Sequence, residues 1–129
     1  MIIAGLVVAL LAAALHVFIF YLESLAWTSK RARAVFGTTE QQAEDTRELA
    51  YNQGFYNLFL AVMVVVGALV IGLSDHRGVG LALVLAGTGA MLAAALVLGL
   101  SSPAHRGAAV KQGALPLIAV IVLVIGCAT

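Results

Sequence analysis

Two of the most apolar segments of the chain carry polar side chains that could do chemistry. His16 and Glu23 lie seven residues apart in the first segment. Asn52, Gln53 and Asn57 stand at the start of another. An imidazole and a carboxylate can exchange protons or bind a cation, and carboxamides both donate and accept hydrogen bonds. Such groups are costly in hydrocarbon unless a partner or a ligand receives them.

The composition indicates that these residues belong to a membrane protein. The chain has 129 residues, of which 63% are hydrophobic and only 10% are charged, whereas soluble domains carry about 25% charged residues. A soluble domain of this size could not cover so much apolar surface with so few charges. The net charge of +1 provides no basic surface for nucleic acid, so we expect no nucleic-acid partner.

Familiar catalytic and metal-binding motifs are absent from the sequence. The chain has one cysteine, Cys127, which excludes an internal disulfide and a thiolate metal site. Phosphate-binding loops, nucleophile elbows and zinc-protease motifs do not occur. The sequence therefore predicts no metal site and no familiar enzyme chemistry, and it identifies neither a cofactor nor a catalytic residue.

Four segments are long enough to cross a bilayer as helices, which takes about 20 residues. Long runs rich in alanine and leucine favour helices over the short alternating strands of a barrel. The sequence thus predicts an all-α integral membrane protein, a four-transmembrane-helix antiparallel bundle that forms one domain over residues 1–129. The expected spans are residues 2–25, 48–73, 79–100 and 108–128.

The connections between these spans carry helix start and stop signals. The first connection offers two overlapping capping boxes, which pair Thr38 with Gln41 or Thr39 with Gln42. We therefore expect the second helix to extend towards residue 40, outside the membrane.

Two prolines mark the later part of the chain. Pro103 should end the third helix, because the residue before a proline resists helical geometry. Pro116 should either start the regular fourth helix or kink it.

The basic residues indicate an orientation, because cytoplasmic loops are enriched in Lys and Arg. Only Arg77 lies in the second connection. We expect the first and third connections in the cytoplasm and both termini on the outer side of a bacterial inner membrane. The first and third connections hold Lys30, Arg31, Arg33, Arg47, Arg106 and Lys111.

Depth in the bilayer groups the polar residues of the first two spans. With a rise of about 1.5 Å per residue, His16 and Asn57 fall within roughly 5 Å of the midplane. Glu23, Asn52 and Gln53 fall roughly 10 to 14 Å towards the cytoplasm. The two helices should then present polar side chains to each other at two depths.

Small residues predict which helix faces pack. Gly5, Ala9 and Ala12 or Ala13 form a stripe on the first helix that His16 continues, and this spacing lets membrane helices approach closely. The third helix repeats alanine every four residues, a packing face for another helix or another copy of the protein. These alanines are Ala82, Ala86, Ala90 and Ala94.

The fourth helix adds two polar residues, Lys111 and Gln112, near its cytoplasmic entry, where they can lie level with Glu23 and Asn52. We therefore expect a polar pocket between the first, second and fourth spans. Its ligand-binding or proton-relay residues would be His16, Glu23, Asn52, Gln53, Tyr56, Asn57, Lys111 and Gln112.

Several motifs in the chain resemble one family of small membrane proteins. They are His16, Leu22-Glu23, Trp27, Val35-Phe36-Gly37, Asn52-Gln53-Gly54-x-Tyr56-Asn57-x-Phe59-Leu60-Ala61, Lys111-Gln112-Gly113 and Pro116. This pattern resembles the integral membrane family described as domain of unknown function 1304, and the resemblance covers nearly the whole chain. The resemblance implies four membrane helices and no settled biochemistry. Members often carry Glu before the first-helix histidine, where this chain has Leu15.

A weaker analogy links Arg47 and Asn52 to the trimeric four-helix membrane proteins of eicosanoid and glutathione metabolism, whose second helix carries an arginine and an asparagine.

Four functions stay open at this point. The leading one is binding of a small amphipathic molecule or lipid headgroup. The others are oligomeric transport of a proton, ion or small solute with His16 and Glu23 as the relay, a thiol-cofactor membrane enzyme, and a structural or partner-binding role. Membrane lipids, and a second copy docked through the third helix, are the other expected partners.

Overall fold

The computed structural model describes residues 1–128, which contain helices and turns but no strand. The elements are α1 (Ile2–Phe20), the π turn η1 (Tyr21–Leu25), α2 (Lys30–Phe36), α3 (Glu40–Asp45), α4 (Arg47–Leu73), α5 (Arg77–Ser101), the 3₁₀ turn η2 (Pro103–His105) and α6 (Arg106–Ala128). Four stretches are long and apolar enough to span a membrane: Ile2–Leu25, Arg47–Leu73, Arg77–Ser101 and Pro103–Ala128. The all-α, four-helix membrane fold predicted from the sequence is confirmed.

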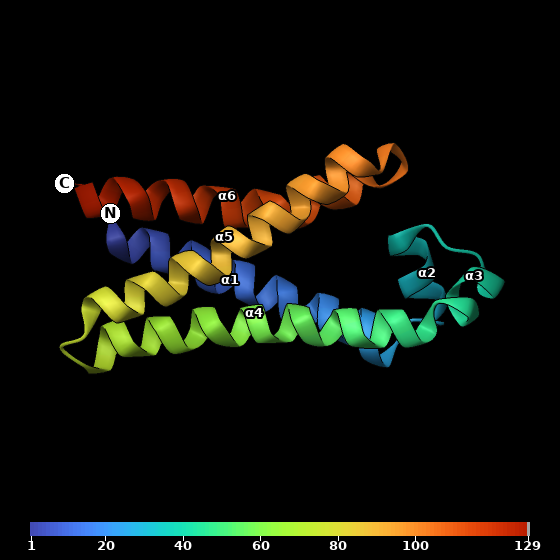
Figure 1. Cartoon of the computed structure of the whole chain (residues 1–129), viewed down its shortest axis with the longest axis horizontal. Helices are drawn as coiled ribbons and strands as arrows, with labels where there is room; N and C mark the ends of the chain where they lie inside the picture. Colours follow the sequence, from blue (N-terminus) through green and yellow to red (C-terminus); the bar gives the residue numbers. More distant parts are fainter. Residues whose placement is uncertain (129) are drawn as a thin grey trace.

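The four long helices form a bundle in which each packs mainly against two others. α1 and α5 both pack against α4 and against α6, so α1 and α5 lie diagonally. The two termini and the α4–α5 turn lie at one end of the bundle, whereas α2, α3 and the α5–α6 connection lie towards the other (Figure 1). The basic first and third connections therefore share one end of the molecule.

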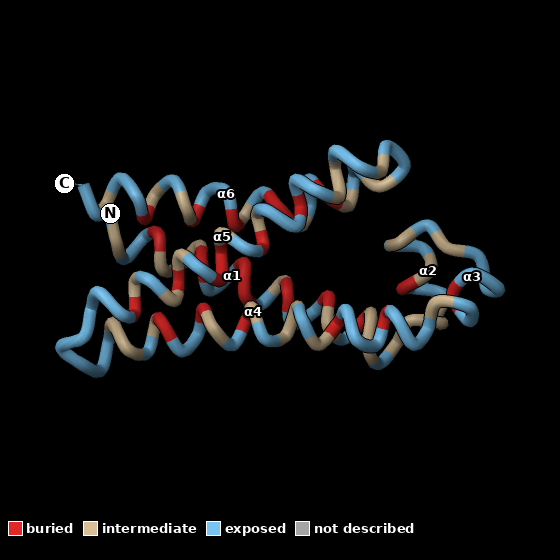
Figure 2. Tube along the Cα trace, viewed as in Figure 1, coloured by how far each residue is buried: buried red, intermediate tan, exposed pale blue. Residues whose placement is uncertain are grey.

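Burial is confined to the facing sides of the long helices. Figure 2 shows buried positions along the inner faces and exposed positions along the outer faces of all four. Large apolar side chains are exposed on every long helix, among them Ile3, Leu69, Leu96 and Ile121. Such extensive apolar surface is rare on soluble monomers, and it suits a bundle surrounded by lipid.

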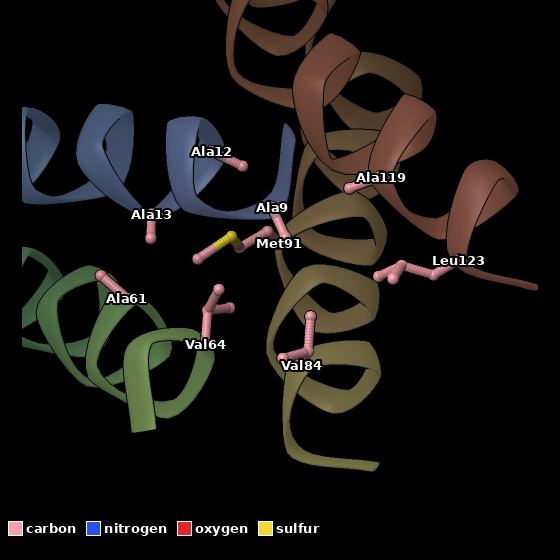
Figure 3. Packing of buried hydrophobic residues seen from close by; sticks show 9 residues of the cluster. All are labelled: Ala9, Ala12, Ala13, Ala61, Val64, Val84, Met91, Ala119 and Leu123. Atoms are coloured by element: carbon pink, nitrogen blue, oxygen red, sulfur yellow. The ribbon is translucent and has the colours of Figure 1, made fainter. Parts of the chain in front are cut away.

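The core is built around small residues of α1. Figure 3 shows Met91 of α5 among Ala9 and Ala13 of α1 and Ala61 and Val64 of α4. The stripe predicted on the first helix is confirmed, since Gly5, Ala9, Ala12, Ala13 and His16 are all buried. Small side chains let membrane helices come close enough for dispersion contacts to hold them together.

α4 and α5 approach each other closely at a pair of glycines. A Cβ on Gly67 would lie 2.7 Å from the carbonyl oxygen of Gly80, and a Cβ on Gly80 would lie 2.7 Å from that of Gly67. Any larger residue would push the two backbones apart, so this pair fixes their crossing point.

The first connection forms two short helices. Of the two capping boxes that the sequence allows, Thr39 with Gln42 is formed. The helix that it caps begins at Glu40 and ends at Asp45, and α4 starts afresh after Thr46, whose φ of −106° and ψ of 5° depart from helical geometry. α3 is therefore a separate helix that leads into α4.

The two prolines behave differently. α5 ends at Ser101, and Ser102 before Pro103 is extended, as predicted. Pro116 lies buried inside α6, which begins at Arg106, so this proline does not start the helix.

Candidate functional site

α1 ends in a single π turn that carries Glu23. The amide of Ala26 donates to the carbonyl of Tyr21 at 3.0 Å, the i to i+5 spacing of a π-helix. Such turns are rare, they often occur at functional sites, and they change the direction in which the following side chains point. Glu23 is partly buried here, against α4.

Two side-chain hydrogen bonds hold the π turn against α4. Asn57 Nδ2 donates to Glu23 Oε2 at 2.8 Å, and it also lies 3.2 Å from the backbone oxygen of Gln53. Ser24 Oγ donates to the backbone oxygen of Tyr51 at 2.8 Å. Glu23 is thus held in place by its neighbour on α4, and its other carboxylate oxygen accepts no hydrogen bond from the residues described.

Gly54 allows this close contact. A Cβ at this position would overlap Ser24 Oγ and would lie 3.0 Å from the backbone nitrogen of Ser24 and 3.1 Å from the Cβ of Glu23. Because two of these atoms are fixed by the π turn, a side chain at residue 54 would separate α4 from η1. Gly54 therefore sets the register between the two helices.

The register differs from the depth estimate made from the sequence. Aligning the first two spans at their midpoints puts Asn57 level with His16. In the structure Asn57 is instead hydrogen-bonded to Glu23, which lies about two helical turns beyond His16 in the chain. That estimate of depth was wrong. The helices are aligned by the contact of Gly54 with the π turn rather than by their midpoints.

A half-open cavity of about 520 Å³ lies beside Glu23, between the end of α1 and the start of α4. Four of its lining residues are carboxylic acids and one, Arg47, is basic. The one ion pair among residues 1–128 joins Arg33 and Glu40, neither of which lines the cavity. The lining residues are Glu23, Ser24, Leu25, Trp27, Thr28, Glu44, Asp45, Arg47, Glu48 and Tyr51.

Trp27 supplies an ordered aromatic wall. Its Nε1 donates to Thr46 Oγ1 at 3.1 Å, and Thr46 Oγ1 in turn donates to the backbone of Gln42 at 2.6 Å. The indole ring also packs against Phe36 with the ring centroids 5.0 Å apart. The break in the helix at Thr46 thereby fixes the tryptophan side chain.

The acidic lining does not form a metal centre. Within residues 1–128, no group of three or more His, Cys, Asp or Glu side chains could hold a metal ion. Carboxylates spread around a cavity and mixed with aromatic rings suit a larger organic cation better than a bare metal ion.

His16 lies apart from this site. Its side chain is 1% exposed, and Nδ1 donates to the backbone oxygen of Ala12 at 2.9 Å. Because a carbonyl oxygen only accepts, a neutral ring has its proton on Nδ1 and leaves Nε2 as an acceptor. No hydrogen bond among the described residues links His16 to Glu23.

The remaining predicted site residues are not gathered at the cavity. Asn52, Gln53 and Tyr56 are exposed on the outer side of α4. On α6, Lys111 is exposed and Gln112 is partly buried, and neither lines the cavity. The cavity is walled by η1, the following turn, α3 and α4, and no residue of the fourth span lines it.

Sequence reasoning missed most of the cavity wall. Ser24, Glu44, Asp45 and Glu48 were not among the predicted site residues, although they line the cavity. The signal that could have found them is the Thr39–Gln42 capping box, because it starts a helix whose acidic end leads into α4. Trp27, a residue type typical of membrane interfaces, marks the opposite wall.

Fold and site together define a multi-pass, all-α membrane protein with an acidic and aromatic cavity at one end of its bundle. The chain belongs to the family described as protein of unknown function DUF1304, whose model matches residues 10–124. No curated protein and no solved structure matches it. The resemblance to this family that the sequence motifs indicated is thus confirmed, and the chemistry has to be inferred from the site itself.

Proposed function

We propose that the protein binds an amphipathic organic cation, with the charged head in the cavity beside Glu23 and the apolar tail in the bilayer. The observation that carries the proposal is the position of Glu23 in the cavity wall, where Asn57 holds one carboxylate oxygen at 2.8 Å. A carboxylate fixed in this way is preorganised to receive a cation with its other oxygen.

The composition of the wall supports a cationic head. Glu44, Asp45 and Glu48 add carboxylates to Glu23, against the single guanidinium of Arg47. Trp27 and Tyr51 supply aromatic faces, which attract ammonium groups through their ring quadrupoles. An anionic head would meet repulsion from most of this wall.

The location of the cavity supports an amphipathic ligand. All three tyrosines and the single tryptophan of the chain belong to this end of the bundle. They are Tyr21, Tyr51, Tyr56 and Trp27. Such residues gather where the bilayer meets water. A ligand whose head occupies the cavity would leave its tail beside η1 and α4, where the apolar side chains of Leu25 and Phe59 are exposed. With the basic connections inside, the cavity opens to the cytoplasm.

The geometry favours binding over a proton relay. A relay through His16 and Glu23 needs a chain of hydrogen bonds between them, but His16 bonds within its own helix and Glu23 bonds to α4. The two groups also lie about two helical turns apart.

We further propose that copies of the protein associate through α5. Ala82, Ala86, Ala90 and Ala94 are all exposed, so this small-residue face is not used for packing within the chain. The inner face of α5 is formed by other residues, including Gly80, Val84, Gly87 and Met91.

The test of cation binding uses the single tryptophan as the reporter. The whole chain in phosphatidylcholine nanodiscs is titrated with dodecyltrimethylammonium below its micelle concentration while Trp27 emission is followed. We expect a saturable change. Dodecyl sulfate and uncharged dodecyl maltoside should not reproduce it, since they share the tail but not the positive charge.

Glu23→Gln is the decisive variant, because its amide oxygen can still accept the hydrogen bond from Asn57 while the negative charge is lost. We expect Kd for the ammonium probe to rise about tenfold, which corresponds to the loss of about 1.4 kcal/mol of charge–charge attraction. Asp75→Asn is the matched control, because Asp75 is exposed and does not line the cavity. Equal Kd values for the two variants would exclude Glu23 as the cation-binding group.

A further inference from the structure

A second concave surface lies between α5 and α6, away from the acidic cavity. It is an open groove of about 440 Å³, and every residue that lines it is apolar except Arg106. Leu96, Val110 and Ala114 are among the apolar lining residues.

The floor of the groove is made by small residues at the helix contact. A Cβ on Gly113 would lie 2.8 Å from the Cβ of Ala95, and one on Gly99 would lie 3.3 Å from the Cβ of Ala109. Leu96 and Val110 rise on the two sides and are 56% and 69% exposed. The result is an apolar channel with a floor of small residues, a shape that suits a hydrocarbon chain.

Arg106 lies at the end of this channel, and only one of its side-chain nitrogens, Nε, has a hydrogen-bond partner among the described residues. Its Nε donates to the backbone oxygen of Gly99 at 3.2 Å, which holds the guanidinium beside the groove. The terminal N–H donors have no partner among the described residues, and no carboxylate of residues 1–128 forms an ion pair with Arg106. A guanidinium that is fixed but unpaired beside apolar surface is arranged for a planar or tetrahedral anion.

The nearby hydroxyl groups are already occupied. Ser101 Oγ donates to the backbone of Val97 at 2.7 Å, and Ser102 Oγ lies 2.6 Å from His105 Nδ1. Among the residues that line the groove, Arg106 is therefore the one with side-chain N–H donors to spare.

We propose that the groove holds an acyl chain of an anionic phospholipid and that Arg106 binds its phosphate. Charge decides between this occupant and a second copy of the chain. Two copies in one membrane share the same topology, so groove-to-groove contact would bring two unpaired Arg106 guanidinium groups to the same depth, where they repel. An anionic lipid instead neutralises the arginine while its tail fills the channel.

Lipid retention by the purified full chain tests this proposal, with native mass spectrometry as the readout. Phosphatidylglycerol and phosphatidylcholine with identical acyl chains are offered separately, and glycerol 3-phosphate is offered as a head without a chain. We expect about tenfold stronger retention of phosphatidylglycerol and no retention of glycerol 3-phosphate, because both the charge and the chain contribute.

Two variants separate the head from the tail. Arg106→Gln should lower phosphatidylglycerol retention to the level of phosphatidylcholine, whereas Arg77→Gln removes a charge at the other end of α5 and should change nothing. Ala114→Phe should fill the groove and weaken both lipids. Ile121→Phe, at an exposed position of α6 outside the groove, is its control.

Three results would overturn the proposal. The first is equal retention of phosphatidylglycerol by the Arg106→Gln and Arg77→Gln variants. The second is equal retention of both lipids by the Ala114→Phe and Ile121→Phe variants. The third is a lipid-free dimer that Ala114→Phe dissociates, which would make a second copy the occupant.

Discussion

Asn57 of α4 donates a hydrogen bond of 2.8 Å to the Glu23 carboxylate in the π turn that ends α1. This bond joins two helices that are far apart in the sequence at the edge of the proposed binding cavity. It also gives a partly buried carboxylate a partner, which such a group needs in an apolar setting.

Replacing Asn57 by Leu should destabilise the protein by about 1 to 3 kcal/mol, because it leaves the Glu23 carboxylate without its donor. Unfolding of the whole chain in detergent measures this change. The Glu23→Leu variant and the double variant complete a thermodynamic cycle, in which the double variant should lose less stability than the two single variants added. Additivity within about 0.5 kcal/mol would show that the two side chains are not coupled.

Gly54→Ala should also destabilise the protein, by about 1 to 3 kcal/mol, because the added methyl group forces α4 away from the π turn. Gly72→Ala is the matched control on the same helix, since no atom lies within 4 Å of a Cβ there. In the control, alanine should be neutral or slightly stabilising, because it favours a helix over glycine. The thermal unfolding midpoint should therefore fall for Gly54→Ala and stay unchanged or rise slightly for Gly72→Ala, and equal shifts would contradict the register that Gly54 sets.

The orientation can be measured with the single cysteine. Cys127 is exposed near the end of α6, so a membrane-impermeant maleimide applied to intact cells should label it if the termini are outside. In a Cys127→Ser background, Asp75→Cys should be labelled in the same way, and Ala104→Cys should be labelled only after lysis. The reverse pattern would put the acidic cavity on the outer side.

Self-association through α5 predicts a specific sensitivity on its outer face. Ala90→Phe puts a bulky side chain in the exposed stripe, where close helix contact needs small residues. Cross-linking in membranes should then recover less dimer or higher oligomer than the parent chain gives. Ile121→Phe, at an exposed position of α6 rather than α5, should leave the yield unchanged, and equal yields from all three proteins would refute this interface.

The sequence was sufficient to predict the fold, because the signals that mark a membrane span add up over many residues. Length and apolar composition define the four spans, and the small-residue stripe from Gly5 to His16 identifies the inner face of α1. These features depend on averages over many residues, so no single contact can upset them.

The site was harder to predict because it depends on a few individual contacts. The π turn at Tyr21–Leu25 changes the direction of Glu23, and the fit of Gly54 against Ser24 shifts α4 relative to α1. Neither leaves a periodic pattern in the sequence. The alignment from midpoints therefore paired Asn57 with His16, and Lys111 and Gln112 were expected at a cavity that they do not line.

The most direct test of cation binding maps where a bound cation lies. A photoreactive alkyl trimethylammonium is cross-linked to the whole chain in nanodiscs, and the modified residues are found by peptide mass spectrometry. If Glu23 binds the cation, modification should fall within residues 23–28 and 44–51 and should be reduced by excess dodecyltrimethylammonium and by Glu23→Gln. Modification confined to the α5–α6 groove, or unchanged by Glu23→Gln, would contradict cation binding at this cavity.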